Sequence, residues 1–447
     1  MPPFCRNVKS SLLWDVSTNY LTDMGFACNY ARWVEVEISI RPKTHVPARG
    51  SRRDALKIIL ASETYPPDVN GAAVFTNRLG VGLAKRGHDI HNLSPSPSGA
   101  SYLEEVDGVT LHRLPSFRYP WHPTFHIAHL RKARHGVGQA IREISPDVVH
   151  LQGHFVICKS AAHHSRLLEI PLVATNHFMP ENIVGQIPFA LPQWALRQAS
   201  AAAWRDVGHA FAGADRVTTP TPYAAELLRG RVGIEGATPI SCGVDTAIFS
   251  SKARMRERRT PPTILFVGRL DAEKHVDVLI KALQHITPLA RLRIVGEGSC
   301  KTSLRSLARR LAVEDRITFT GYLDNDALVD EYVRADIFCM PGTAELQSIA
   351  TLEAMAAGLP IVAALSSALP HLVKSGINGE LFTPGNDQEL GSALAHILAD
   401  SDLRWRFGLA SREHAELHDL EGTLDAYEEI YFDVIRRREE KAIPTAR

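Results

Sequence analysis

Residues 339–360 read Cys-Met-Pro-Gly-Thr-Ala-Glu-Leu-Gln-Ser-Ile-Ala-Thr-Leu-Glu-Ala-Met-Ala-Ala-Gly-Leu-Pro and place Glu345 and Glu353 eight positions apart. The apolar run 337–340 is typical of a core strand, and the Pro-Gly pair that follows ends it. Residues 348–357 have the composition of a short helix, which the Gly-Leu-Pro sequence terminates. The stretch therefore predicts a strand, a loop and a helix, with Glu345 at the carboxyl end of the strand.

A carboxylate in that position suits a ligand with many hydroxyl groups. In open α/β sheets, ligands bind in the crevice beyond the carboxyl ends of the strands, and a helix amino terminus offers free N–H groups to phosphates. One glutamate could accept a sugar hydroxyl and the other a ribose hydroxyl. An ordinary surface location of both side chains explains the pair equally well, because charged residues mostly lie at protein surfaces.

Length and composition indicate an ordinary globular protein. The chain has 447 residues, of which 45% are hydrophobic and 22% are charged, and its formal net charge is +1. This length predicts two or three domains, and the near-neutral balance does not favour nucleic acid as a partner. The sequence has no apolar stretch long enough to cross a bilayer and no signal-peptide core. We expect a cytoplasmic protein that could rest on the inner face of the membrane as a peripheral protein.

The six cysteines are scattered along the chain without a Cys-x-x-Cys pair. This spacing argues against a structural zinc site and against a secreted disulfide framework. Reduced thiols in a cytoplasm fit best, and no metal site is expected.

Hydrophobic periodicity predicts two doubly wound α/β domains of similar size. Residues 1–54 show no sustained periodicity, and we expect them to form a poorly ordered extension outside the fold. Apolar strands alternate with helices over 55–245, and after a basic, proline-containing linker the same rhythm continues over 246–420. The final segment 421–447 contains a helix that could pack back on the first domain.

Two cations follow the first strand of the second domain, in the run Gly268-Arg-Leu-Asp-Ala-Glu-Lys274. Arg269 and Lys274 therefore emerge at the same edge of the sheet as Glu345. Arginine binds phosphate oxygens through its planar guanidinium and lysine as a point charge, and both would stabilise a departing nucleoside diphosphate. Two solvated loop cations are the alternative.

Two loops of the first domain also follow strands. Gly71 lies between a strand and a helix, where a glycine lets a phosphate approach the helix start. His177 follows the predicted strand 171–175 and could orient a sugar hydroxyl or share a proton. A lone histidine among 20 is more often structural. Neither a Gly-x-Gly-x-x-Gly fingerprint after the strand nor a Gly-x-x-x-x-Gly-Lys-Ser/Thr motif is present, which disfavours a dinucleotide dehydrogenase.

Residues 126–144 form an amphipathic helical pattern. Its apolar face is predicted to contain Ile127, Leu130, Val137, Ile141 and Ile144, and its cationic face Arg131, Lys132 and Arg134. Such a helix could rest on an anionic membrane surface. A helix that packs on its own sheet with a solvated basic side explains the pattern slightly better, because amphipathic helices normally cover α/β sheets.

Several short motifs together resemble the family 4 retaining glycosyltransferases of the GT-B fold. They are Gly268-Arg-Leu-x-x-x-Lys274, Val295-Gly-Glu-Gly298, Cys242-Gly-Val-Asp-Thr-x-x-Phe249, the pair Glu345 and Glu353, and Asn378-Gly-x-Leu-Phe382. The similarity runs from about Leu56 to about Arg437. It implies two Rossmann-like α/β domains with an interdomain cleft, the first on the acceptor side and the second binding the donor nucleotide.

The resemblance also implies roles for single residues. His177, Arg269, Lys274 and Glu345 would be catalytic, with the two cations on the donor diphosphate and His177 near the anomeric carbon of the sugar. Glu353 would bind the ribose, and Gly71 would approach the phosphate. The other residues expected to bind the donor are Tyr322 and Leu323, whose backbone would meet the base, and Leu346, Gln347, Ser348 and Ile349.

Two positions depart from the family pattern. Many members have a double glycine where this chain has Gly71-Ala72, and many have Phe-Gly where this chain has Gln347-Ser348. The second departure resembles bacterial lipid glucosyltransferases and mannosyltransferases more than starch or sucrose enzymes.

The resemblance implies transfer of a hexose from a nucleotide diphosphate sugar, of the UDP-glucose or GDP-mannose type, to a hydroxyl acceptor. The sugar nucleotide is a substrate, so no cofactor is expected. The acceptor stays open among a lipid such as phosphatidylinositol or diacylglycerol, a polysaccharide and a small metabolite. Three alternatives remain: a nucleotide-sugar 2-epimerase of the same two-domain form, a non-catalytic sugar-nucleotide-binding protein, and a peripheral membrane adaptor. The complete set Arg269, Lys274, Glu345 and Glu353 weighs against the last two.

Overall fold

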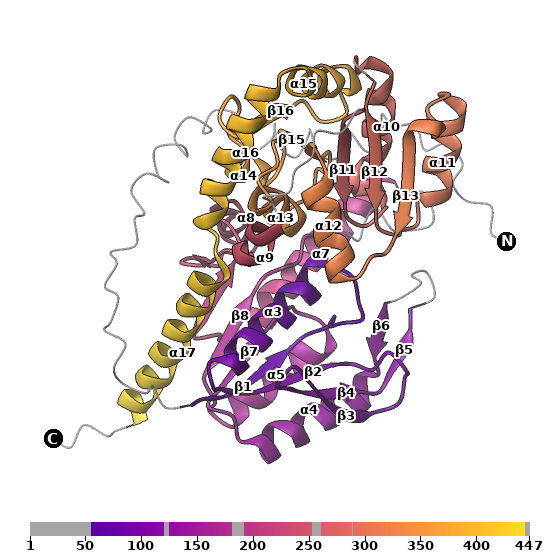
Figure 1. Ribbon diagram of the computed structural model, residues 1–447. Coiled ribbons are helices and arrows are strands. Elements are labelled where there is room, and N and C mark those ends of the chain that lie inside the picture. The colour runs from indigo at the N-terminus through magenta and orange to yellow at the C-terminus, as the bar shows by residue number, and fades with distance from the viewer. Residues whose placement is uncertain (1–54, 120–124, 181–191, 253–260, 288, 443–447) are drawn as a thin grey trace.

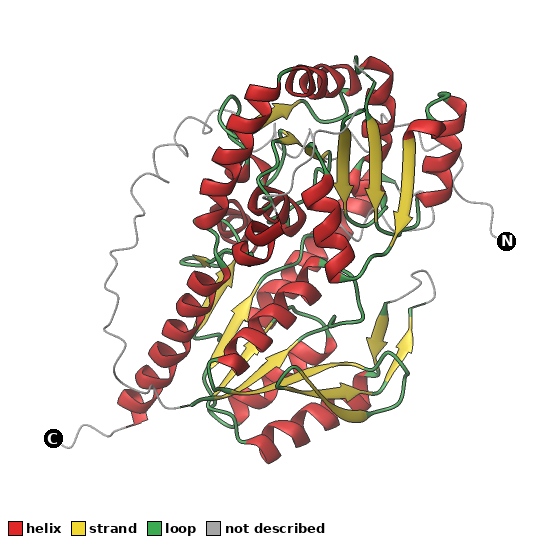
Figure 2. Cartoon of the chain, in the orientation of Figure 1, coloured by secondary structure: helices red, strands yellow, loops and turns green. Residues whose placement is uncertain are grey.

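Two α/β domains lie one above the other in the computed structural model, which describes residues 55–119, 125–180, 192–252, 261–287 and 289–442 (Figure 1). The extension predicted for 1–54 lies outside the described residues. Helices cover both faces of each sheet, as Figure 2 shows. The structure is thus the doubly wound α/β architecture that the alternating pattern predicts.

The first domain contains a sheet of eight described strands in the order β10-β9-β8-β7-β1-β2-β4-β3. All neighbours pair in parallel except β3 and β4. The strands are β1 (Lys57–Ala61), β2 (Asp89–Pro95), β3 (Tyr102–Val106), β4 (Val109–Leu114), β7 (Val148–Leu151), β8 (Leu172–Thr175), β9 (Arg216–Thr219) and β10 (Thr238–Pro239).

Both faces of this sheet are buried. Ile58 and Leu60 of β1 contribute to one core cluster, whereas Ile59 and Ala61 contribute to another. Successive side chains of a strand point to opposite faces, so an uninterrupted apolar run is what a strand between two helix layers requires. The helices of this domain are α3 (Gly71–Lys85), α4 (Leu130–Ile144), α5 (Val156–Leu167), α7 (Gln193–Phe211) and α8 (Pro222–Val232).

An antiparallel hairpin at the edge of this sheet was not among the predicted elements. Strands β3 and β4 are joined at Asp107 and Gly108, whose φ angles are 52° and 78°. Two positive φ angles suit a two-residue hairpin turn, and Asp-Gly between apolar alternations is a strong sequence signal for it. The Asp-Gly signal for a hairpin is present in the sequence. It was overlooked because strands alternate with helices on either side of it.

The second domain contains a parallel sheet in the order β13-β12-β11-β14-β15-β16. Its strands are β11 (Thr263–Val267), β12 (Arg291–Val295), β13 (Ile317–Gly321), β14 (Ile337–Met340), β15 (Ile361–Ala364) and β16 (Gly379–Phe382). Its helices are α9 (Thr246–Lys252), α10 (Val276–Ala282), α11 (Lys301–Arg310), α12 (Asn325–Arg334), α13 (Ile349–Ala356), α14 (Leu369–Leu372), α15 (Asp387–Ala399) and α16 (Ser401–Glu416). Counted from β11, the order is 3-2-1-4-5-6, which reverses between β11 and β14.

The last helix, α17 (Leu420–Ala442), packs on the first domain (Figure 1). Leu424, Tyr427, Tyr431 and Val434 join the core cluster that contains Ile58 and Leu60. The Tyr431 hydroxyl lies 2.7 Å from His150 Nδ1 of β7. The chain therefore crosses between the domains twice, and the two crossings are joined by a β-bridge between Val244 and Asp419.

The predicted apolar face of 126–144 is partly wrong. Val137, Ile141 and Ile144 are buried, but Leu130 is 68% exposed. Ile127 belongs to the short strand β6 (His126–Ala128), which pairs with β5 (Ser116–Arg118), so the helix begins only at Leu130. Because Leu130 is the first residue of α4, it lies ahead of the part of the helix that meets the sheet.

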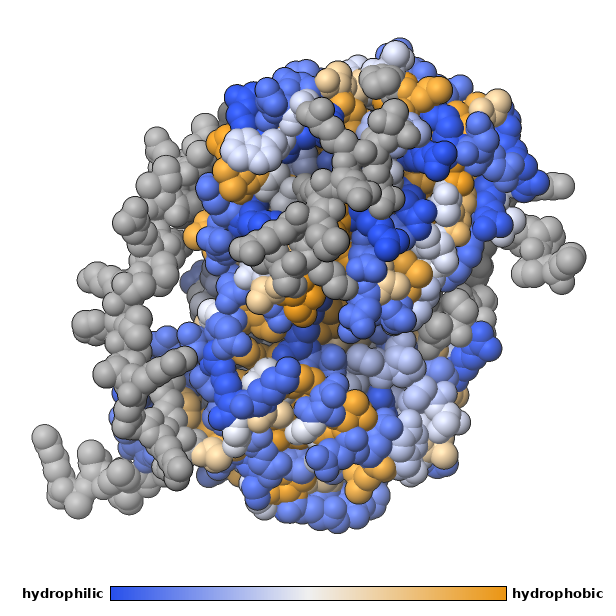
Figure 3. Space-filling model, viewed as in Figure 1, coloured by the Kyte–Doolittle hydropathy of each residue, from blue (hydrophilic) through white to orange (hydrophobic). Residues whose placement is uncertain are grey.

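None of the described helices combines the length and the apolar character needed to cross a bilayer. On the face shown in Figure 3, hydrophobic residues are scattered among hydrophilic ones.

Candidate functional site

The candidate site lies where the strand order of the second sheet reverses. Arg269 and Lys274 follow β11, and Glu345 follows β14, the strand beside it. Loops that leave neighbouring strands at such a point diverge, and the space between them is where open α/β sheets bind ligands. Sheet order, which the sequence alone does not give, therefore brings the predicted residues to one place.

Lys274 and Glu345 form an ion pair between these two loops. Lys274 Nζ donates to Glu345 Oε1 at 2.5 Å, and the side chains are 15% and 8% exposed. Gly342 keeps room for the pair, since a Cβ there would lie 3.1 Å from Glu345 Oε1. A hydrogen-bonded pair with so little exposure has a defined geometry, as a ligand site requires.

Arg269 is held by carboxylates of its own loop. Its two terminal nitrogens donate to Asp271 Oδ2 and to Glu273 Oε1, both at 2.7 Å. Burial raises the pKa of Glu273, and the charge of Arg269 opposes that rise. Two cations and three carboxylates thus meet in this part of the site. Asp271 and Glu273 were not predicted as site residues, although both lie inside the motif Gly268-Arg-Leu-Asp-Ala-Glu-Lys274.

Glycines allow two loops of the second domain to touch. A Cβ on Gly298 would lie 2.5 Å from the backbone of Leu270, and one on Gly296 would lie 2.0 Å from the carbonyl oxygen of Gly268. The contact is sealed by a 2.9 Å hydrogen bond from Leu270 N to the Glu297 carbonyl oxygen. The motif Val295-Gly-Glu-Gly298 therefore supports the loop that carries Arg269.

The segment that begins α13 also joins the two domains. Leu346 packs into the core of the first domain, and its carbonyl oxygen accepts a 2.8 Å hydrogen bond from the Thr221 hydroxyl. Gln347 Oε1 accepts from Cys242 N at 2.7 Å. Ser348 caps the helix by accepting from Thr351 N. The side chains of Leu346 and Gln347 thus hold the interface between the domains.

Glu353 is already bonded on both oxygens. Oε2 accepts from the Tyr332 hydroxyl at 2.9 Å, and Oε1 pairs with Arg78 of the first domain. The Glu353 side chain is 7% exposed. Arg78 and Tyr332 were not predicted as partners of Glu353, because nothing in the local pattern of either helix marks them.

Gly71 and Ile349 face one another across the domain interface. Gly71 is the first residue of α3, whose N-cap Asn70 accepts a 2.9 Å hydrogen bond from Ala73 N. A Cβ on Gly71 would lie 3.8 Å from Ile349 Cδ1. The amino termini of α3 and α13 are therefore neighbours. Gly71 and Ile349 are both among the donor-binding residues predicted from the sequence.

His177 lies in the first domain, against Phe75 and Gln152. Its Nε2 is 3.0 Å from Gln152 Oε1, and its ring centroid is 4.6 Å from that of Phe75. Burial lowers the pKa of His177 to about 3, so the imidazole is neutral near pH 7. Gln152 Nε2 in turn lies 3.1 Å from His150 Nδ1. Gln152 was not predicted, and its place directly after β7 is the signal that could have identified it.

Tyr322 and Leu323 directly follow β13, the strand at the edge of the second sheet. The Tyr322 side chain is 62% exposed, and Leu323 packs on the core of the second domain. In the described ranges, no group of three or more His, Cys, Asp or Glu side chains could hold a metal ion.

Comparisons with known proteins agree with this arrangement. The family described as "Glycosyl transferases group 1" matches residues 249–414, and "Glycosyltransferase Family 4" matches residues 69–248. A GDP-mannose-dependent alpha-mannosyltransferase of Mycolicibacterium smegmatis is 31% identical over 366 residues, which is 80% of this chain and 92% of that protein. An alpha-monoglucosyldiacylglycerol synthase of Streptococcus pneumoniae is 25% identical over 366 residues, or 78% of this chain and 80% of that protein.

A solved structure shows the same fold. Sucrose-phosphate synthase from Thermosynechococcus elongatus superposes with a TM-score of 0.71 at 21% identity, covering 85% of this chain and 100% of that chain. Two Rossmann-like domains, joined by two crossings and with a charged site at the switch point of the second, define a GT-B protein. The chain belongs to the group 1 and family 4 glycosyltransferases, and it is a glycosyltransferase.

Proposed function

We propose that this glycosyltransferase transfers a hexose from a nucleotide diphosphate sugar to a hydroxyl acceptor with retention of the donor's configuration. The observation that carries the proposal is the ion pair between Lys274 and Glu345, beside Arg269, at the switch point of the second sheet. This arrangement places cations, which bind a diphosphate, next to a carboxylate, which accepts hydrogen bonds from sugar hydroxyls. In this proposal the site binds the donor, and the acceptor approaches from the first domain.

The cations act on the leaving group. Lys274 has three N–H donors, so it can keep Glu345 while it binds a phosphate oxygen, and Arg269 has further donors beyond the two bonds it makes. Charge that develops on the leaving diphosphate is then stabilised by groups already in position. Gly71, without a side chain, lets the phosphate approach the start of α3.

The reaction proceeds at one face of the sugar. The bond from the anomeric carbon to the phosphate oxygen breaks, the acceptor oxygen bonds to the same carbon from the same side, and the acceptor proton passes to the departing phosphate. Neutral His177 orients a sugar hydroxyl near that carbon through one hydrogen bond. Glu345 orients a second hydroxyl, and Glu353 accepts from the ribose.

GDP-mannose is the first donor to test, and UDP-glucose the second. The relative that is 31% identical is named for GDP-mannose dependence and for mannosyl transfer, and the one that is 25% identical is a glucosyldiacylglycerol synthase. The second name also favours a lipid acceptor, such as diacylglycerol or phosphatidylinositol.

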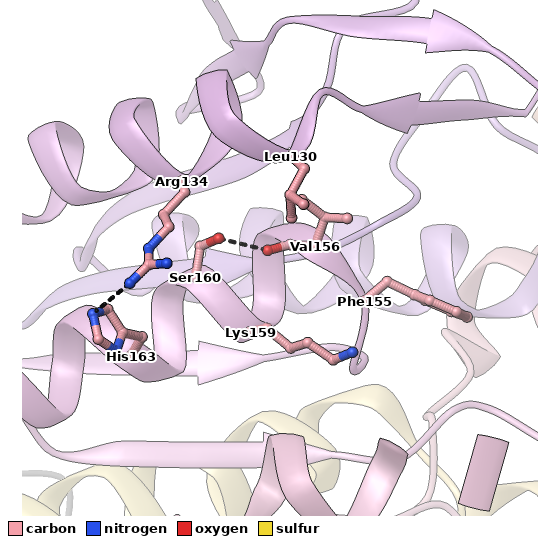
Figure 4. A pocket seen from close by; sticks show the side chains of 7 residues that line it. All are labelled: Leu130, Arg134, Phe155, Val156, Lys159, Ser160 and His163. Carbon is pink, nitrogen blue, oxygen red and sulfur yellow. Dashed lines mark hydrogen bonds between the residues drawn. The ribbon is translucent and has the colours of Figure 1, made fainter. Parts of the chain in front are cut away.

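A basic hollow between α4 and α5 supports a peripheral position on an anionic membrane. This cavity has a volume of about 310 Å³, and in it Arg134 Nη2 lies 3.1 Å from His163 Nε2. In Figure 4, Arg134 points toward His163 and Leu130 lies near Val156. An adjoining cavity of about 290 Å³ has only basic side chains in its lining, namely Arg131, Arg134, His135, Arg142, His163 and His164. Cations beside an exposed apolar side chain suit lipid headgroups at the surface of a bilayer.

A donor panel tests the proposed reaction. GDP-mannose, UDP-glucose, UDP-GlcNAc and UDP-galactose are incubated with lipid extracts, and products are identified by mass spectrometry. We expect one donor to dominate and its sugar to appear on a lipid. A sugar epimerised at C2 in the absence of any acceptor would favour the epimerase, and nucleotide binding without turnover would favour a binding protein.

Vesicle sedimentation tests the membrane surface separately. We expect binding to vesicles that contain phosphatidylglycerol, little binding to phosphatidylcholine, and a loss in a variant with Arg131→Gln, Lys132→Gln and Arg134→Gln. Arg406→Gln, at an exposed site on α16, is the control. If vesicle binding persisted in Arg269→Ala and Glu345→Ala while no nucleotide bound even to the unsubstituted protein, the chain would act as a membrane adaptor.

A further inference from the structure

We propose that Arg78 is a positioning residue for Glu353, so that the carboxylate proposed for the ribose is competent only while α3 packs on α13. The inference rests on the proposed function, because it assigns to Glu353 the ribose of a nucleotide. It adds a residue of the first domain to a subsite that otherwise belongs to the second.

Two residues of α3 lie against α13. Gly71 and Arg78 are seven residues apart, which is about two turns of a helix, so they lie on the same face. Gly71 meets Ile349 at the start of α13, and Arg78 meets Glu353 one turn further along. The ion pair and the approach of Gly71 to Ile349 both link these two helices, which come from different domains.

The Glu353 carboxylate depends on Arg78 for its counter-charge. Its other hydrogen-bond partner, Tyr332, is neutral, because burial first and the Glu353 charge second raise the pKa of that phenol well above its usual value. A carboxylate with a 7% exposed side chain is costly to keep ionised without a cation beside it. The guanidinium therefore supplies the counter-charge of Glu353 and fixes the direction of its side chain.

The guanidinium of Arg78 does not use all of its hydrogen-bond donors. Its side chain is 26% exposed, yet within the described residues its NH1 atom is buried and has no hydrogen-bond partner. Buried donors are usually paired, and exceptions call for an explanation. Alignment of the other nitrogen with Glu353 is the explanation that the geometry offers.

The pair couples the nucleotide to the domain interface. Separation of the domains would take Arg78 away from Glu353, so a ligand that needs the carboxylate in this orientation binds better to the packed arrangement. By linkage, the same ligand then favours packing of α3 on α13. The ribose hydroxyls, and not the phosphates, are the part of the ligand that reports this coupling.

The experiment compares a nucleoside diphosphate with its 2′,3′-dideoxy analogue by calorimetry, using GDP and UDP as probes. We expect the full chain to prefer the ribonucleotide by about tenfold or more, the equivalent of one or two hydrogen bonds to a charged group. Arg78→Met should lose that preference while binding the dideoxy analogue within about twofold of the unsubstituted protein. Glu353→Gln should also lose the preference for the ribonucleotide. The double variant should bind the ribonucleotide no more weakly than either single variant.

Arg86→Met is the matched control. Arg86 is the C-cap residue of the same helix and makes ion pairs at 2.6 to 2.8 Å with α17. We expect this variant to keep the ribose preference. Arg78→Lys, which retains a charge without the planar guanidinium, should keep about a third of the preference and serves if Arg78→Met does not fold.

An unchanged preference in folded Arg78→Met, or in Arg78→Lys, would overturn the inference. An equal loss in Arg86→Met would overturn it too. Failure of the proposed function looks different, because neither nucleoside diphosphate would then bind to the unsubstituted protein.

Discussion

Lys274 Nζ lies 2.5 Å from Glu345 Oε1, although the two residues are 71 positions apart and follow different strands. The contact exists because β11 and β14 are neighbours at the point where the order of the sheet reverses. Two loops that diverge from such a point normally leave space for a ligand, and here a charged pair spans that space.

Removal of either partner of this pair should abolish turnover without unfolding the protein. Lys274→Met and Glu345→Gln should each lower kcat at least 100-fold, roughly 3 kcal/mol of transition-state stabilisation. Because each leaves a nearly buried charge without its partner, each should also lower the free energy of unfolding by about 1–3 kcal/mol. Sugar transfer and urea unfolding measure the two effects.

The double variant and a surface pair provide the controls. Lys274→Met with Glu345→Gln should regain part of the lost stability and remain inactive. Lys281→Met breaks a 2.8 Å pair with Asp277 on the surface of α10 and should change neither quantity. Near-normal rates in either single variant would contradict the site assignment.

Gly298→Ala should destabilise the second domain. Its Cβ would lie 2.5 Å from the Leu270 backbone, so the loop that carries Arg269 would have to move. We expect a loss of about 2 kcal/mol or more in the free energy of unfolding, together with weaker nucleotide binding.

Gly230→Ala is the opposite case. Gly230 lies in α8, and its Cβ would have no atom within 4 Å, so alanine should stabilise the helix by about 0.5–1 kcal/mol. Equal effects of the two substitutions on thermal unfolding would contradict the role given to the contact between the loops.

The protein should lose stability when the pH falls from 6.5 to 4. Burial lowers the pKa of His150 and His177 from 6.5 to about 3, and that of His112 and His154 to about 4. In this pH range the unfolded chain binds these protons and the folded chain does not, so their contribution is present above pH 6.5 and declines below it.

Two carboxyl groups act in the opposite sense. Burial raises the pKa of Glu63 to about 7 and of Asp68 to about 6, so their contribution is lost as the pH rises through those values. The four histidines outweigh them. His154→Gln should reduce the slope of stability against pH by about 1.4 kcal/mol per pH unit between pH 5 and 6, measured by urea unfolding. His396→Gln, at an exposed site, should leave the slope unchanged, and an unchanged slope in both would disprove the assignment.

A chain that begins at Ala55, without residues 1–54, should fold and bind nucleotide as the full chain does. The first strand, β1, pairs on both sides with strands inside the described residues, β2 and β7. We expect the midpoint of thermal unfolding to stay within about 2 °C, a change well under 1 kcal/mol. Insoluble or unfolded protein would show that the boundary is wrong.

Much of the site could be predicted because its signals are local. The apolar run 337–340 and the loop after it predicted β14 and Glu345, and the motif from Gly268 to Lys274 marked both cations. Sequence reasoning also predicted that Glu353 belongs to the site, and its role there stays a prediction. It did not identify Arg78, Tyr332 or Gln152, since each gains its role from a contact that its neighbours in the chain do not encode.

The sequence by itself determined the two doubly wound domains, through hydrophobic periodicity and through glycine and proline at the turns, which act over a few residues. Tertiary structure alone decided that Arg78 meets Glu353, a contact between residues 275 positions apart. The physical reason is that periodicity tells which face of a helix is buried but not which helix it is buried against. The packing of α3 on α13 settles that choice, and with it the surroundings of the carboxylate.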